Sequence, residues 1–386
     1  MELKDIGGTI ERETLRAVQR EQDIPVVGLL QHPQQETGQQ PLPLQQPLPL
    51  LQYNNQKILE QAGAFGQSKQ QQQENRVVLV RGGGGGVGDD PSAGQDQTVG
   101  SLRHLADLSV PYNRASETPF FWHLAKSGGT SLKHMYSDCY GLVEACESGV
   151  AEGHASDITL RIITLESTWS FVNVDVTTER GIRRAASLQV VASRKAHLVV
   201  SPLLHPSAQQ LFTHRNKGRF FTVFRDPLDR VVSLFYYLQK ATWEPTYNPT
   251  LQQMSFASYV NSTLVESNFV VRTLLDKMEA PLTQEDFGVA KEILRTKCLV
   301  GLLEELDETV RRVDLYFGFR PKDNDPAGFQ ACRSKYLQQG TNRHQHPALP
   351  APDTTAYQEL ARKNFMDVWL YDYAKELFAQ QASLFP

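Results

Sequence analysis

Long apolar runs and cysteine-rich patterns are both missing from this sequence. The amino-terminal stretch MELKDIGGTIERETLRAVQR lacks the apolar core of a signal peptide, and no run of about 18 apolar residues occurs, so neither a signal nor a membrane span is visible. The four cysteines form no CxxC or Cys/His pattern with zinc spacing, so we expect no metal site. They permit disulfides but suit a reducing compartment equally well, so they leave the compartment open.

An excess of positive charge is also missing. The 386 residues carry a formal net charge of −4, which argues against a general nucleic-acid binder because such proteins usually present a basic surface. This balance still leaves room for a local basic pocket that binds a small polyanion. A hydrophobic content of 40% with 21% charged residues is typical of a globular protein, and the length allows one large domain with additional segments or two smaller domains.

The first 115 residues differ in amino-acid composition from the rest of the chain. They contain the stretch PLPLQQPLPLLQ, a run of glutamines at 70–73 and five consecutive glycines at 82–86. Such segments offer few positions that a folded core could bury, so burial cannot offset the entropy that ordering would cost. We therefore expect residues 1–115 to be mostly disordered, either as a tail without a specific partner or as a weak interaction segment.

Residues 118–386 have the pattern of one folded domain. The segments 119–124, 197–201 and 220–224 are short, apolar and rich in β-branched or aromatic residues, as buried strands are. Helical patterns separate and follow them, at 130–145, 181–194, 228–240, 284–296, 304–318 and 357–381. Strands that alternate with helices predict an α/β fold of three layers, P-loop-like, in which helices flank a central parallel sheet.

The first motif follows the strand predicted at 119–124 and consists of Lys126, Ser127, Gly128, Gly129, Thr130 and Ser131. The glycines allow a tight turn that exposes backbone amides, and the following helix adds unpaired N–H groups and the positive end of its dipole. Lys126 supplies a cation and the hydroxyl side chains supply donors, so the segment predicts a phosphate pocket. It is not a Walker A loop, whose lysine follows the glycines. The alternative is an ordinary strand–turn–helix with a surface lysine.

The second motif, FFTVFRDPLDRVVS, includes the strand predicted at 220–224. Arg225 stands at the strand end, and Asp226 is a natural N-cap with a proline at the first helical position. Ser233 lies about two turns into this helix, from where its hydroxyl could face the same cleft as Arg225. A guanidinium and a hydroxyl suit a second, terminal phosphate. The alternative is that Arg225 pairs with a carboxylate such as Asp229, a structural role that we expect for Arg230.

Two phosphate sites at two strand ends suit a ligand with phosphates at the 5′ and 3′ positions of one ribose. FFWHLAKSGGTSL resembles the 5′-phosphosulfate loop, and FRDPLDRVVSLFYYL the 3′-phosphate motif, of the sulfotransferases that use 3′-phosphoadenosine 5′-phosphosulfate (PAPS). The similarity runs from residue 119 to the carboxyl terminus and is closest to the Golgi carbohydrate branch, which includes heparan sulfate 2-O-sulfotransferases and related algal proteins. It implies transfer of a sulfuryl group from PAPS to a carbohydrate hydroxyl, without a metal, in the Golgi.

The resemblance also assigns roles to single residues. Lys126 and the loop amides would stabilise the departing phosphate of PAPS, as oxyanion donors do elsewhere. Arg225 and Ser233 would hold the 3′-phosphate without touching the reacting sulfur, so their loss should mainly weaken binding. The remaining residues of the first motif would complete the cofactor pocket.

The catalytic base departs from the family pattern. Relatives often carry a Gly-His pair after the strand that precedes the second motif, whereas this chain has Ser-Pro at 201–202. We expect His205 to be the base, because it follows that strand at the sheet edge where ligands of open α/β folds bind. His197 begins the strand and should lie at the opposite edge, and His123 is close enough to orient the loop. A carboxylate such as Glu166 is the next candidate.

Two other functions compete with sulfuryl transfer. A non-catalytic relative would bind PAPS, or the bisphosphate left after transfer, without turnover. A P-loop-type kinase would need Mg²⁺ and a lysine in the Walker position, where this chain has none. The expected partner is a glycan or another hydroxyl acceptor, and no nucleic acid is expected. The family's usual membrane anchor is not visible in the sequence, so a cytoplasmic location also stays open.

Overall fold

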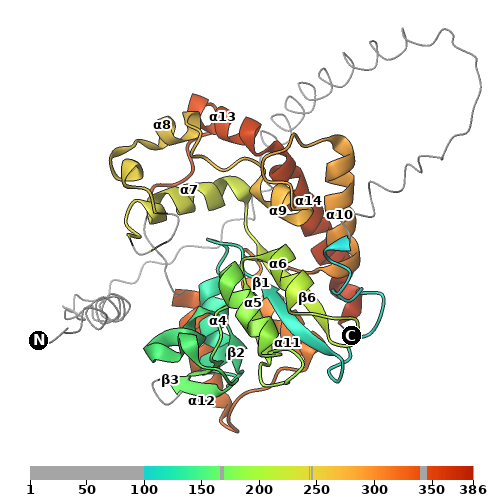
Figure 1. Cartoon of the computed structure of the whole chain (residues 1–386). Coiled ribbons are helices and arrows are strands. Elements are labelled where there is room, and N and C mark those ends of the chain that lie inside the picture. Colours follow the sequence, from blue (N-terminus) through green and yellow to red (C-terminus); the bar gives the residue numbers. More distant parts are fainter. Residues whose placement is uncertain (1–99, 166–168, 243, 245–246, 340–345, 386) are drawn as a thin grey trace, which may run out of the picture. The chain divides into compact units, whose positions relative to one another are not determined.

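The computed structural model describes residues 100–165, 169–242, 244, 247–339 and 346–385 (Figure 1). The helices and strands below belong to one compact unit. The expectation that the amino-terminal tail is disordered falls on residues 1–99, which lie outside the described residues.

A seven-stranded sheet runs through the described part of the domain. Its strands lie in the order β3-β4-β2-β5-β1-β6-β7, and neighbours run parallel except for the edge pair β3 and β4, which is antiparallel. The strands are β1 Glu117–Trp122, β2 Glu144–Ala145, β3 Ile162–Leu165, β4 Trp169–Val172, β5 Leu198–Ser201, β6 Lys217–Phe224 and β7 Leu299–Leu302. The apolar runs predicted to be strands are confirmed as β1, β5 and β6.

Helices occupy most of the remaining described chain. They are α4 Gly129–Asp138, α5 Glu179–Ser187, α6 Leu204–Gln210, α7 Pro227–Leu238, α8 Phe256–Asn261, α9 Phe269–Leu275, α10 Gln284–Lys297, α11 Leu306–Phe317, α12 Pro326–Ser334, α13 Thr355–Lys363 and α14 Phe365–Gln380. Further helical segments are the 3₁₀ helices η1 Glu147–Ser156, η2 Pro249–Gln253 and η4 Gln381–Leu384 and the π-helix η3 Lys335–Gln339. The long helix predicted at 357–381 is divided at Asn364, whose buried amide donates to the carbonyl of Glu266.

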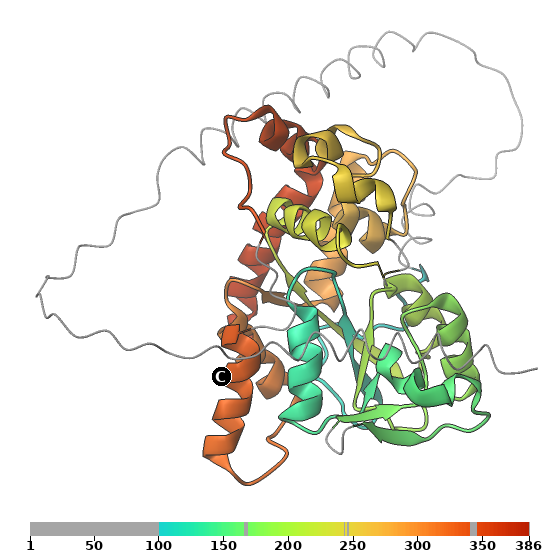
Figure 2. The same cartoon turned by 90° about the vertical axis from the view of Figure 1, so that its left-hand side faces the viewer.

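Alternation along the central strand explains the three layers. Phe120 and Trp122 of β1 pack into one apolar core, with α5, α6, α9, α10 and α14, whereas Phe121 packs into a second core with α4 and α11. Successive side chains of a strand point to opposite faces, so a strand that is apolar throughout must be covered on both sides. Figure 2 shows helices on both sides of the strands. The predicted α/β class with a central, mostly parallel sheet is confirmed.

The folded domain begins earlier than the boundary predicted near residue 115. Leu102 and Leu105 are 0% and 1% exposed and belong to the first apolar core. Leu105 also forms a parallel bridge to Gly218, next to the start of β6. Two leucines three residues apart are too short a pattern to stand out beside low-complexity sequence, and only their distant partners make the segment fold.

Arg219 ties the same segment to the sheet. Its guanidinium is 0% exposed, donates to the carbonyl oxygens of Asp107 and Val110 at 2.6 and 3.1 Å, and pairs with Glu117 at 2.7 Å. A buried arginine needs all of these partners, because removing them would leave a charge without solvent or counter-ion. Residues 100–110 are therefore structural parts of the domain.

A disulfide joins Cys139, at the end of α4, to Cys332 on α12, which lie 193 residues apart in the sequence. Cys146 and Cys298 are buried and carry free thiols. Within the described residues, no helix combines the length and apolarity that crossing a membrane requires.

Candidate functional site

The loop between β1 and α4 makes the turn that its two glycines predict. Gly128 has a φ of 81°, in the left-handed region, and stands at the N-cap of α4. A Cβ at this position would lie 2.7 Å from the Cδ1 of Leu303, so both backbone conformation and space favour glycine. The loop leaves the carboxyl end of β1, the sheet edge at which open α/β folds bind ligands.

Unsatisfied donors gather where α4 begins. No side chain caps this helix, and within the described residues the amides of Gly129 and Thr130 donate to no acceptor. The hydroxyl of Ser127 is buried, and it too has no hydrogen-bond partner there. Buried donors normally find an acceptor, so this set fits an anion such as a phosphate. Ser131, in the same first turn of α4, is 5% exposed.

Lys126 adopts an uncommon backbone conformation within the loop. Its φ is 63°, which is rare for a residue with a Cβ and costs of order 1–3 kcal/mol unless the surroundings enforce it. Its ammonium group lies 4.1 Å from the centre of the Tyr237 ring on α7, a distance typical of cation–π attraction. Such strain often accompanies a functional position.

The second motif lies beside the first. Arg225 follows the carboxyl end of β6, which neighbours β1, and its Nη1 donates to the carbonyl oxygen of Lys126 at 3.1 Å. Burial lowers the pKa of Arg225 while the charges of Asp229 and Asp226 raise it, and an arginine remains protonated at neutral pH under both influences. Among the described residues, no carboxylate forms an ion pair with Arg225. The alternative that Arg225 pairs with Asp229 is therefore not what the structure shows.

The start of α7 is built as its sequence predicts. The Asp226 side chain caps the helix by accepting hydrogen bonds from the amides of Leu228 and Asp229 at 2.9 and 3.0 Å. Ser233 lies on the same helix and is 6% exposed. Arg230 is buried and pairs with Glu266 at 2.5 Å, which confirms the structural role expected for it.

His205 does not suit the role of catalytic base that we predicted. It is 3% exposed, and both ring nitrogens are occupied: Nε2 donates to the carbonyl of Thr273 at 2.8 Å, and Nδ1 accepts from the hydroxyl of Ser101 at 2.6 Å. Burial also lowers its pKa. A base needs a nitrogen that reaches the acceptor hydroxyl, and here neither is available. Its place after β5 is as expected, but its contacts are those of a structural residue.

The other candidates differ in position. His197 accepts a hydrogen bond at Nδ1 from the amide of Val143 at 3.0 Å, at the start of β5 and away from the loop. Glu166 lies outside the described residues. His123 follows β1 directly, and its ring contacts the loop so closely that a Cβ on Gly129 would lie 2.1 Å from its Cδ2. Within the described residues, its ring nitrogens have no hydrogen-bond partner.

Charged side chains that the sequence reasoning missed lie next to His123. Lys133 of α4 is buried and forms an ion pair with Glu147, which follows β2. Burial, and then the charge of Lys133, lower the pKa of His123 to about 4, so its imidazole is neutral at pH 7. Burial alone would raise the pKa of Glu147, but Lys133 outweighs it and the pKa falls to about 2. The sequence does not reveal the ion pair between Lys133 and Glu147, because β2, which precedes Glu147, lies inside a segment with a helical pattern.

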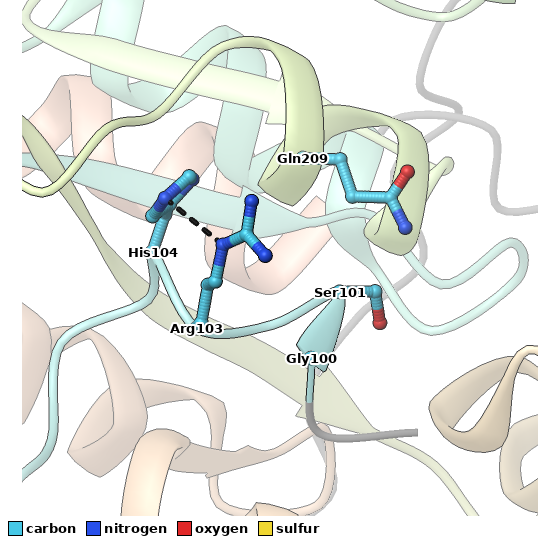
Figure 3. Close-up of a pocket in the computed structure, with 5 residues that line it drawn as sticks. All are labelled: Gly100, Ser101, Arg103, His104 and Gln209. Carbon is cyan, nitrogen blue, oxygen red and sulfur yellow. Dashed lines mark hydrogen bonds between the residues drawn. The ribbon is translucent and has the colours of Figure 1, made fainter. Parts of the chain in front are cut away.

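A separate hollow of about 500 Å³ lies beside α6 (Figure 3). It is lined by Gly100, Ser101, Arg103, His104 and Gln209. Its lining includes no residue of either motif, so we do not assign the nucleotide to it. Within the described residues, no cluster of three or more His, Cys, Asp or Glu side chains could hold a metal ion.

Known proteins offer only a weak structural likeness. No family model matches the chain, and no curated protein matches it. Among solved structures, it is similar to mouse sulfotransferase SULT7A1 complexed with PAP, with 10% identity and a TM-score of 0.31 over 68% of this chain and 79% of that one. A TM-score this low supports no conclusion about the fold or the function of this chain.

Proposed function

We propose that this chain is a sulfotransferase that transfers the sulfuryl group of PAPS to a hydroxyl of a carbohydrate. The observation that carries the proposal is the 3.1 Å hydrogen bond from Arg225 to the carbonyl of Lys126, because it brings the two motifs together at one sheet edge. Among the described residues, the loop has unsatisfied amides and the adjacent arginine has no carboxylate partner, an arrangement that suits two phosphates of one nucleotide.

Each half of the site would bind a different phosphate. The amides of Gly129 and Thr130, the Ser127 hydroxyl and Lys126 would surround the 5′-phosphosulfate. Arg225 would hold the 3′-phosphate, with the hydroxyl of Ser233 on α7 as a second donor. This division predicts that loss of the arginine mainly affects nucleotides that carry a 3′-phosphate.

Transfer would proceed by displacement at sulfur. A bond forms between the acceptor oxygen and sulfur, the bond from sulfur to the 5′-phosphate oxygen breaks, and that oxygen keeps the electron pair. The loop donors and Lys126 then stabilise the charge that develops on the phosphate, as preorganised donors do in other transfer enzymes. The proton of the acceptor hydroxyl must go to a base.

His123 replaces His205 in this proposal as the base. Its ring contacts the loop and is neutral at pH 7, and its nitrogens have no partner among the described residues. General-base catalysis by a histidine typically contributes about 10²–10⁴-fold to a rate. Lys133 and Glu147 would set the field around the imidazole, and the nearby negative charge of bound PAPS would favour its protonated form after transfer.

Lys126→Ala tests the proposal through turnover. We expect it to lower kcat for transfer of radiolabelled sulfate from PAPS to a panel of glycans by more than tenfold, which corresponds to about 1.4 kcal/mol of barrier. Lys195→Ala, at an exposed lysine, is the matched control and should leave kcat unchanged. If Lys126→Ala retains more than a tenth of the wild-type kcat, the lysine does not stabilise the leaving group.

The proposal includes a location in the Golgi lumen. Its support on the molecule is the disulfide between Cys139 and Cys332, because structural disulfides form mainly in oxidising compartments such as the secretory lumen. Fractionation of the producing cells should therefore recover the protein within membrane-enclosed vesicles, protected from added protease. Recovery from the cytosol with all cysteines reduced would contradict this location.

A further inference from the structure

One motif of the sequence has no part in the proposed reaction. Asn261-Ser262-Thr263 is an Asn-x-Ser/Thr triplet, the sequence to which N-linked glycans are attached in secreted proteins. A second triplet, Asn248-Pro249-Thr250, carries proline in the middle, which prevents modification. The chain thus contains one triplet that can accept a glycan and one closely similar triplet that cannot be glycosylated.

The acceptor triplet lies on the surface at the end of a helix. Asn261 is the last residue of α8, and both Asn261 and Thr263 are exposed. The Nδ2 of Asn261 donates to the carbonyl of Ala257 at 2.9 Å, one helical turn earlier, and Ala257 is also exposed. Water can replace that hydrogen bond, so a glycan on Nδ2 would leave no buried polar group without a partner.

The folded turn around the triplet is held by local hydrogen bonds. Lys363 of α13 donates to the carbonyls of Val260 and Ser262 at 2.8 and 3.0 Å, and the Ser262 hydroxyl donates to the carbonyl of Tyr259 at 2.7 Å. None of these bonds involves the Asn261 side chain. The turn can therefore form in the same way whether or not that side chain carries a sugar.

The disulfide supplies the second, independent observation. Cys139 and Cys332 are linked although 193 residues separate them, whereas the buried Cys146 and Cys298 remain thiols. A bridge of this kind forms in the oxidising lumen of the secretory pathway, which is the compartment in which Asn-x-Ser/Thr triplets are modified.

We propose that Asn261 is an N-glycosylation site of this protein. The donor would be a lipid-linked oligosaccharyl pyrophosphate: a bond forms between Nδ2 and the first sugar carbon, and the bond from that carbon to the pyrophosphate oxygen breaks. The pyrophosphate keeps the electron pair and one amide proton is released. The proposal rests on the luminal location proposed above and not on sulfuryl transfer.

Mass spectrometry of the full chain isolated from its native cells tests the site. Digestion with peptide N-glycanase in ¹⁸O-labelled water should convert Asn261 to an ¹⁸O-labelled aspartate, and a non-reduced digest should contain the Cys139–Cys332 peptide pair. Asn248 should remain unlabelled in the same sample. An unmodified Asn261 in the isolated protein overturns the proposal, whatever its sulfotransferase activity.

Two variants, expressed in a eukaryotic host behind a cleavable secretory leader, provide the controls. Asn261→Gln should lose the only glycan, whereas Pro249→Ala completes the triplet at Asn248 and should add a second one. A glycan at Asn248 of Pro249→Ala with none at Asn261 would also contradict the proposal. It would show that the protein reached the lumen and that Asn261 was not modified there. Sulfuryl transfer is measured separately on the same samples, so a failure of one proposal is distinguishable from a failure of the other.

Discussion

Gly129 offers a sharp test of the loop, because its neighbour is a candidate for catalysis. A Cβ added here would lie 2.1 Å from Cδ2 and 2.5 Å from Nε2 of His123, whereas non-bonded carbon atoms prefer about 3.5–4.0 Å. Either the imidazole or the start of α4 must move by more than an ångström. Overpacking of this kind costs about 1–3 kcal/mol of stability.

The larger expected effect of Gly129→Ala is on nucleotide binding. If the helix start shifts, the amides of Gly129 and Thr130 no longer point to a common anion. Hydrogen bonds to charged groups contribute about 1.5–3 kcal/mol each, so losing one should weaken binding of adenosine 3′,5′-bisphosphate by roughly 10- to 100-fold. Isothermal titration measures the binding, and thermal unfolding measures the stability.

Gly288→Ala is the matched control for the same chemical change. Gly288 lies on the exposed side of α10, and a Cβ there would meet nothing within 4 Å. Alanine suits a helix interior better than glycine, so this variant should gain about 0.5–1 kcal/mol of stability and bind the nucleotide as the wild type does.

The double variant Gly129→Ala/His123→Ala identifies the cause. Removing the imidazole removes the clash, so the double variant should bind adenosine 3′,5′-bisphosphate more tightly than Gly129→Ala alone, an interaction energy that a mutant cycle measures directly. Wild-type affinity in Gly129→Ala would refute the placement of the nucleotide at this loop. Weak binding that His123→Ala does not improve would refute the contact as its cause.

Two further predictions concern the domain boundary and the base. Leu105→Ala should lower the free energy of unfolding by about 2–5 kcal/mol, because the side chain is 1% exposed. Val110→Ala, at 55% exposure, should change it by less than about 0.5 kcal/mol. Equal and small effects of both variants in chemical denaturation would show that residues 100–110 belong to the tail and not to the folded domain. If His123 is the base, kcat/KM should fall as pH drops below about 4, where its imidazole takes up a proton. His123→Ala should abolish this acidic limb of the pH profile. His205→Ala should lower the melting temperature but retain the acidic limb. A limb that vanishes in His205→Ala alone would restore the original assignment.

The parts of the fold that the sequence predicts correctly depend on local signals. The strands β1, β5 and β6 are short apolar runs, and Asp226 followed by proline is a helix start that needs no distant partner. The loop glycines predict a turn for the same local reason. That is why both motifs could be placed at strand ends before their contact was known.

The parts of the fold that the sequence does not predict depend on contacts between distant residues. β2 has two residues and lies inside a segment with helical periodicity, so only its pairing with β4 and β5 makes it a strand. His205 is occupied by Ser101, 104 residues away, and by Thr273, 68 residues away, and no sequence pattern predicts either bond. The ion pair between the buried Lys133 and the half-exposed Glu147 cannot be predicted from the sequence for the same reason, because each looks like an ordinary surface residue.

The pairing of two phosphate sites in one pocket is tested most directly by calorimetric titration of the full chain with matched nucleotides. The wild type should bind adenosine 3′,5′-bisphosphate more tightly than adenosine 5′-phosphate, and should not prefer ATP with Mg²⁺. Arg225→Ala and Ser233→Ala should each weaken binding of the bisphosphate and leave that of the 5′-phosphate nearly unchanged. Equal losses for both nucleotides, or tighter binding of ATP with Mg²⁺, would contradict a site built for PAPS.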